Sequence, residues 1–183
     1  MSYYALVASL PALKIGQPSS LSLEAYIDSC TSWLSEQELA TLKSVVQNEE
    51  KRSTNPLAKR WFYAETQLRN AVVQLRGQKL GVDAKSFLQP HEGFSGTIES
   101  KVTEAMSKSN PVEMEQGLDH LRWQLAEELI GDDPFGFSKI LAYGIQLSLV
   151  ERWSQMDDEK GAEALEAIIV ANTEKETQTE ESV

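Results

Sequence analysis

The side chains best suited to metal binding or nucleophilic catalysis are few, because the chain has two histidines and one cysteine. His91 lies in a stretch rich in glycine and proline, and His120 has only glutamines one helical turn away on either side. Neither has a second metal-binding side chain at the spacing that zinc and iron sites use. Cys30 falls between Ile27 and Trp33 on the apolar face of a predicted helix, so we expect a buried thiol that behaves as a small hydrophobic group. We expect no metal site and no catalytic thiol.

Paired carboxylates, another common catalytic arrangement, occur where helix ends and polar faces are expected. In a chain with 28 acidic residues, such pairs arise without an active site. The stretch 93–96 contains two glycines but lacks the lysine of a phosphate-binding loop, and there is no Gly-x-Ser-x-Gly sequence. The sequence therefore favours a protein without catalytic activity and without a cofactor. The carboxylate pairs are Glu49-Glu50, Glu127-Glu128, Asp132-Asp133 and Asp157-Asp158.

Glu65, Arg69 and Arg76 form a charged stripe on a predicted helix over residues 56–79. At 100° per residue their side chains project within about 40° of one another, and apolar residues flank the stripe on both sides. Two interpretations are open. Glu65 and Arg69 form a surface ion pair worth roughly a few tenths of a kcal/mol. Alternatively, a neighbouring helix partly covers the stripe, and Arg76 reaches an acid on that helix and fixes the helix register.

The charge distribution is uneven. The net charge is -11, yet residues 51–85 carry eight basic and two acidic side chains, a net +6, so the other residues carry -17. An acidic chain argues against a nucleic-acid partner, because phosphate binding requires many lysines and arginines. The basic segment is either a solvated face or a docking face for an acidic partner, where charge would raise the association rate. The candidate docking residues are Lys51, Arg52, Lys59 and Arg60.

Apolar residues at helical spacing predict six helices. Three predicted helix starts pair a capping side chain with proline, at Asn55-Pro56, Asn110-Pro111 and Asp133-Pro134, and Ser35 with Glu38 has the spacing of a capping box. Residues 3–10 fit a short strand or a short helix, and residues 81–96 read as a loop. The predicted helices are 22–33, 36–48, 56–79, 111–130, 134–156 and 162–169.

The predicted helix over 134–156 differs from the others, because no charged residue lies between Lys139 and Glu151. A helix that is hydrophobic on every side is buried, so we place it at the centre of the core. Its apolar stretch is too short to cross a bilayer, and the N-terminus lacks a signal peptide. We predict an all-α protein of about six to eight helices, bundle-like, with one domain over residues 1–171, an acidic disordered tail over 172–183 and no insertion into a membrane.

Two segments resemble the C subunit (d in eukaryotes) of V/A-type rotary ATPases. In the first, which runs from Glu65 to Gly81, the family-like positions are Asn70, Lys79 and Gly81. The opening stretch 3–11 is similar to a short bacterial family of unknown function associated with V/A-type ATPase gene clusters. The chain is shorter than the usual subunit, which is built of helical repeats, and it has Glu151-Arg152-Trp153 where that family continues differently. The second segment, 133–145, matches at Phe135, Gly136, Leu141, Ala142 and Tyr143.

This resemblance implies an all-helical, non-enzymatic adaptor of the central stalk. Its partners would be the rotor shaft and the proteolipid ring, and it would be cytoplasmic, peripheral to the inner membrane through the complex. Two other hypotheses remain open: a helical scaffold or assembly factor with an unrelated partner, and an enzyme of an unrecognised type. Four large aromatic side chains could pack in the core or anchor a partner. These are Trp33, Trp61, Trp123 and Trp153.

Overall fold

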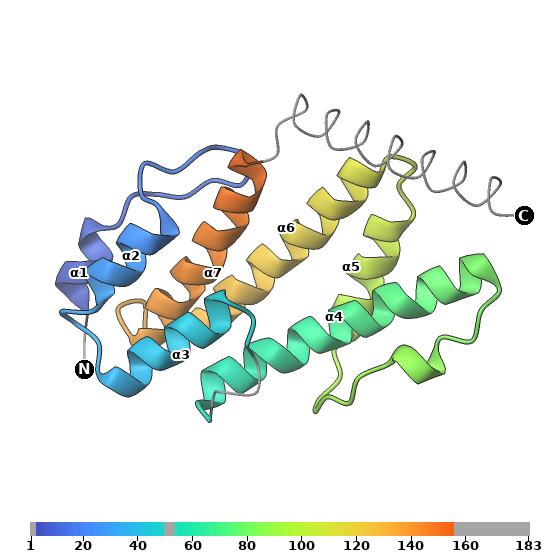
Figure 1. Ribbon diagram of the computed structural model, residues 1–183, viewed down its shortest axis with the longest axis horizontal. Coiled ribbons are helices and arrows are strands. Elements are labelled where there is room, and N and C mark those ends of the chain that lie inside the picture. The colour runs from blue at the N-terminus through green and yellow to red at the C-terminus, as the bar shows by residue number, and fades with distance from the viewer. Residues whose placement is uncertain (1–2, 50–53, 156–183) are drawn as a thin grey trace, which may run out of the picture.

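The computed structural model describes residues 3–49 and 54–155, and this part of the chain contains seven α-helices, one 3-10 helix and no strand. The prediction of an all-α fold is confirmed. In Figure 1, α1, α2, α3 and α7 lie at one end of the molecule, and α5 and η2 lie at the other end. Helices α4 and α6 run between the two ends and contact elements of both. The elements are α1 Tyr4–Ser9, α2 Leu23–Cys30, α3 Glu36–Val46, α4 Pro56–Leu80, η2 Lys85–Phe87, α5 Gly96–Met106, α6 Pro111–Ile130 and α7 Phe137–Ser154.

Local capping signals position three of these helices as predicted. The Ser35 hydroxyl accepts from the Glu38 amide, and the Glu38 carboxylate accepts from the Ser35 amide at 3.0 Å, which is a complete capping box. Asn55 and Asn110 cap α4 and α6, and each side-chain oxygen accepts from the amide two residues on at 2.9 Å. The proline after each asparagine occupies the first helical position, where no amide hydrogen is needed.

The predicted start of α7 at Asp133-Pro134 is wrong. Asp133 instead makes a turn: its carboxylate accepts from the Phe135 amide at 3.1 Å and its carbonyl from the Gly136 amide at 3.3 Å. The helix begins at Phe137. Gly136 suits this turn because a Cβ there would lie 2.6 Å from a carboxylate oxygen of Asp133.

In two other segments the structure decides an alternative that the sequence left open or adds a helix that the sequence did not predict. Residues 4–9 are helical, which decides between strand and helix at the N-terminus. The loop predicted over 81–96 ends where α5 begins, and α5 itself has no counterpart among the predicted helices. Its N-terminus has no side-chain cap, so the strongest local start signal is missing. The helix predicted near 162–169, the tail predicted over 172–183, and Lys51 and Arg52 lie outside the described residues.

The predicted central position of α7 is confirmed. Ile140, Leu141 and Leu147 are completely buried, and every residue between them is also buried. The packing against α3 is close, because a methyl group on Gly144 would lie 2.8 Å from Leu42 Cδ1. The Tyr26 hydroxyl donates to the Ile140 carbonyl at 2.6 Å and thereby ties α2 to α7.

The buried apolar residues form two clusters rather than one. The larger surrounds α7 and includes α1–α3, the start of α4 and the end of α6. The smaller joins the second half of α4 to α5 and the first half of α6. A layer of buried charge lies where α4 and α6 pass from one cluster to the other, and we call this level the waist. No helix in the described part of the chain is both long enough and apolar enough to cross a membrane.

Candidate functional site

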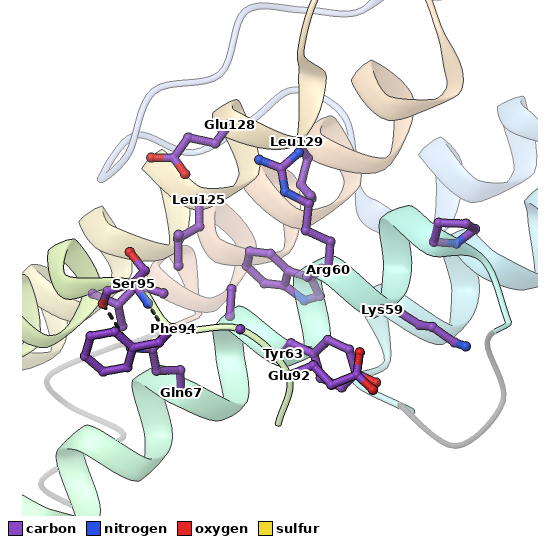
Figure 2. Close-up of a pocket in the computed structure, with 15 residues that line it drawn as sticks. Lys59, Arg60, Tyr63, Gln67, Glu92, Phe94, Ser95, Leu125, Glu128 and Leu129 are labelled. Atoms are coloured by element: carbon purple, nitrogen blue, oxygen red, sulfur yellow. Dashed lines mark hydrogen bonds between the residues drawn. The ribbon is translucent and has the colours of Figure 1, made fainter. Parts of the chain in front are cut away.

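A groove of about 540 Å³ lies between the first half of α4, the end of α6 and the loop 92–95. Trp61, Leu125 and Leu129 contribute apolar surface to it, and Lys59 and Arg60 lie on its α4 side. Figure 2 shows Arg60 extending toward α6, where Glu128 and Leu129 lie, while Lys59 points away from that helix. We call this hollow the α4–α6 groove.

Side-chain amides on α4 fix the loop that forms one wall of the groove. The buried Gln67 donates from Nε2 to the Ser95 carbonyl at 2.9 Å and accepts from the Ser95 amide at 3.0 Å. Asn70, one turn on, makes the same reciprocal pair with the backbone of Gln89, at 2.7 and 2.9 Å. The loop is therefore held at two points, and Phe94 is left 76% exposed at the rim of the groove.

The composition of the α4–α6 groove suits recognition of another polypeptide. Its apolar floor would bury side chains of a ligand, and its charged edge would orient that ligand. The edge is mixed, since Glu92 and Glu128 line the groove together with the two cations. Within the described residues Lys59 and Arg60 make no ion pair, so both are available to an external acid.

The predicted stripe divides into a buried part and an exposed part. Glu65 is 5% exposed and accepts from Arg69 Nε at 2.9 Å, as the i,i+4 spacing indicates. Arg76 is exposed and has no ion pair among the described residues, so a contact of Arg76 with an acid on a second helix is not found in this part of the chain. Arg122 on α6 makes that contact instead, because its Nε and Nη2 each bind one Glu65 oxygen at 3.0 Å.

Asp119 on α6 completes this arrangement and is fully buried. Its Oδ1 accepts from Arg122 Nη1 at 2.8 Å, and its Oδ2 accepts from Trp153 Nε1 at 2.8 Å and from Arg152. Burial alone would lower the pKa of Arg122, but the charges and hydrogen bonds of Glu65 and Asp119 outweigh it and hold that pKa above its usual value. We call Glu65, Arg69, Asp119, Arg122 and Arg152 the waist network.

The hydrogen bonds and ion pairs of the waist network connect α4, α6 and α7. These contacts hold the three helices together. Each buried carboxylate accepts three hydrogen bonds, and breaking such an arrangement leaves an uncompensated charge. The spacing of charged residues along the sequence indicates only part of this network. Asp119 and Arg122 are three residues apart on α6, but the partner Glu65 is 57 residues away from Arg122.

The positions that the sequence analysis compared with the rotary-ATPase subunit make contacts within the chain. Lys79 donates to the carbonyl of Met106 at the end of α5 at 2.9 Å, and Gly81 ends α4 with a left-handed φ of 67°. The Phe135 carbonyl accepts from the Tyr3 amide at 2.7 Å, and the Tyr143 hydroxyl donates to the Pro11 carbonyl at 3.0 Å. Leu141 and Ala142 are completely buried in the core, Asn70 holds the loop, and Gly136 makes the turn before α7.

The tryptophans have different surroundings. Trp61 is 6% exposed and reaches the floor of the α4–α6 groove, whereas Trp33 is 48% exposed. Trp123 Nε1 donates to Glu127 at 2.9 Å, and Trp153 Nε1 donates to the buried Asp119.

Neither the histidines nor the cysteine line the α4–α6 groove or belong to the waist network. His120 is exposed, with Nδ1 2.8 Å from the Gln116 carbonyl, and His91 lies in the loop beside Asn70 and Gln89. Cys30 is completely buried as predicted, and burial raises the pKa of its thiol. Among residues 3–49 and 54–155, no group of three or more His, Cys, Asp or Glu side chains is arranged to hold a metal ion.

Comparison with known proteins gives one match. Residues 100–177 match the model of a family described as a protein of unknown function (DUF2764). The matched region covers the last seven of the 11 residues of α5, the whole of α6 and α7, and 22 residues after Gln155. No curated protein and no solved structure matches the chain. The matched region thus includes Asp119, Arg122 and Arg152 of the waist network.

Proposed function

We propose that this protein is a non-catalytic helical adaptor that binds a partner in the α4–α6 groove. One observation carries the proposal: the groove combines an apolar floor around Trp61 with two cations, Lys59 and Arg60, that lack an ion pair among the described residues. The loop wall is held by Gln67 and Asn70 before any partner binds. A preformed groove loses less conformational entropy on binding than a disordered surface.

The partner that fits this groove is an amphipathic helix with an acidic side. A helix in a groove inserts apolar side chains spaced by three or four residues. Its acids would approach Lys59 and Arg60, which would raise the association rate and fix the direction of the helix. Glu92 and Glu128 also line the groove and would repel an acid placed next to them, so the acids of the ligand would have to lie close to the two cations.

Within this role, we propose a peripheral subunit of a V/A-type rotary ATPase, similar to the C/d subunit between the rotor shaft and the proteolipid ring. The resemblance over residues 65–81 and 133–145 supports this proposal. A torque-transmitting adaptor needs a body that moves as one unit, and the waist network suits that need because it joins α4, α6 and α7. In that complex ATP hydrolysis or synthesis belongs to other subunits.

Affinity purification of the full-length protein from its native host tests this assignment. We expect the shaft and ring subunits of the ATPase to co-purify, and repeated purifications without them would refute the rotary-ATPase role. A second candidate, a scaffold or assembly factor with an unrelated partner, uses the same groove. The mixed charge of the groove edge is compatible with it. Recovery of a different, stoichiometric partner that is lost when Arg60 is reversed to glutamate would establish that alternative.

A further inference from the structure

A second pocket, of about 170 Å³, lies at the waist, where α3, α4, α6 and α7 all contribute side chains to it. We call it the waist pocket, and among the described residues it shares only Trp61 with the α4–α6 groove. Ile145 and Leu149 of α7, one helical turn apart, give it apolar walls together with Val46 of α3. Its volume is that of about six water molecules in the liquid, so it is large enough for one small ligand.

Three arginines also line the waist pocket, and two of them have donors that no acceptor uses. Arg152 Nε is buried and has no hydrogen-bond partner among the described residues, although Nη2 of the same side chain binds Asp119. The one contact of Arg69 with the described residues, with Glu65, uses Nε and leaves both terminal nitrogens without a partner there. Because a guanidinium carries only donors, the group that would complete these contacts is an acceptor. The three arginines are Arg69, Arg122 and Arg152.

The charge around the waist pocket matches an acceptor with a single negative charge. The three arginines carry +3, and the two carboxylates bound to them in the waist network carry -2, which leaves +1. Glu115 lies 3.5 Å from Arg152, but it is 41% exposed and does not line the pocket, so it compensates this charge only weakly. Glu65 does line the pocket, and it would repel a doubly charged ion such as phosphate more strongly than a singly charged one.

We propose that the waist pocket binds a small monocarboxylic acid with a short, branched apolar chain. The carboxylate accepts from Arg152 Nε and from the terminal nitrogens of Arg69, since a planar guanidinium matches the two oxygens of a carboxylate. The apolar chain lies against Val46, Ile145 and Leu149 and removes their surface from water. Apolar walls with a few converging polar groups are the usual form of a small-molecule site. This inference does not depend on the function proposed for the α4–α6 groove.

Side-chain NMR of the full-length protein tests this inference, with isovalerate as the probe. We expect isovalerate to shift the Nε–H signals of Arg152 and Arg69 until they saturate, and to leave the signal of Arg76 unchanged. Isovaleramide has the same shape without the charge, and inorganic phosphate has charge without the apolar chain. Each should therefore bind at least about tenfold more weakly than isovalerate. No shift with isovalerate, or equal binding of isovalerate and either control compound, would overturn the proposal.

Substitutions on α4 test whether the waist pocket is the site of binding. Arg69 is 54% exposed, and Arg69→Gln should weaken isovalerate binding about tenfold, the effect of losing one charge-assisted hydrogen bond. The matched control, Arg76→Gln, makes the same change on α4 outside the pocket and should leave the affinity unchanged. Lys59→Glu/Arg60→Glu, which alters only the α4–α6 groove, should also retain binding. Equal effects of Arg69→Gln and Arg76→Gln, or loss of binding in the groove variant, would overturn the proposal.

Discussion

The first three turns of α4 carry charged side chains in two different surroundings. Lys59 and Arg60 lie beside an open groove and make no ion pair within the described residues. Glu65, one turn further on, is 5% exposed and binds two arginines from two helices. Charged side chains are therefore exposed beside the groove at one level of the helix and buried in a network at the next. Substitutions at the two levels should separate partner binding from stability.

The largest loss of stability is expected where buried charge would be left without its partner. Asp119→Ala would remove the acceptor of Trp153 and one acceptor each of Arg122 and Arg152, so we expect the free energy of unfolding to fall by about 3–5 kcal/mol. Urea unfolding followed by circular dichroism measures this change. The control is Glu115→Ala: Glu115 also approaches Arg152 but is 41% exposed, so it should cost less than about 1 kcal/mol. Equal effects of the two substitutions would remove the distinction between the buried and the exposed acid.

Substitution of a buried apolar residue tests whether burial, rather than charge, determines how much stability a substitution costs. Leu147 is completely buried in the cluster around α7. Leu147→Ala should cost about 2–5 kcal/mol. Leu125 is only partly buried and lines the α4–α6 groove, so Leu125→Ala should cost less in the same unfolding measurement. An unchanged unfolding midpoint for Leu147→Ala would contradict the central position of α7.

Tyr3 and Glu38 form an intermediate case, because their contact is only partly buried. The Tyr3 hydroxyl donates to Glu38 Oε1 at 2.7 Å. Burial, and to a smaller extent this hydrogen bond, raises the pKa of Tyr3 from 10.0 to about 12. A phenol whose pKa is higher in the folded chain contributes stability below its unfolded pKa and loses it as pH rises. Tyr3→Phe should therefore cost about 0.5–1.5 kcal/mol at neutral pH and reduce the loss of stability between pH 10 and 12. Urea unfolding repeated at several pH values measures both effects, and an unchanged alkaline slope would argue against the contact.

The smallest effect on folding is expected for the exposed cations of α4. Arg76 is exposed without an ion pair among the described residues, so Arg76→Gln should change the free energy of unfolding by less than about 0.5 kcal/mol. Thermal unfolding is sufficient to test this. A loss of more than about 1 kcal/mol would mean that the charged stripe extends along α4 as a structural feature.

Sequence reasoning found those parts of the fold that depend on neighbouring residues. Ser35 with Glu38, and Asn55 and Asn110 before proline, start helices through contacts within two or three residues. The absence of charge along α7 indicated its burial, because an unpaired charge cannot be placed inside a core. The same local reasoning misplaced the start of α7, since the hydrogen bonds of Asp133 close a turn instead of capping a helix.

The parts that sequence reasoning missed depend on contacts between distant segments. Helix α5 has a short apolar pattern and no side-chain cap, and it is held by packing against α4 and α6. The sequence predicted only part of the waist network. Glu65 and Arg69 were identified by their spacing, but Arg122 was not, because its approach to Glu65 depends on how α6 packs on α4. The groove was equally hidden, although Lys59 and Arg60 were singled out by charge. Gln67, which fixes its loop wall, gives no distinct signal in the sequence.

Quantitative co-purification with a charge-reversed groove tests the central claim most directly. The variant Lys59→Glu/Arg60→Glu is compared with Lys14→Glu/Lys108→Glu, which makes the same charge change at exposed positions outside the groove. Both variants should unfold within about 0.5 kcal/mol of the unmodified protein. We predict that the groove variant loses its partner, which we propose to be the rotary ATPase, while the control retains it. Full retention of the partner by the groove variant would contradict the account.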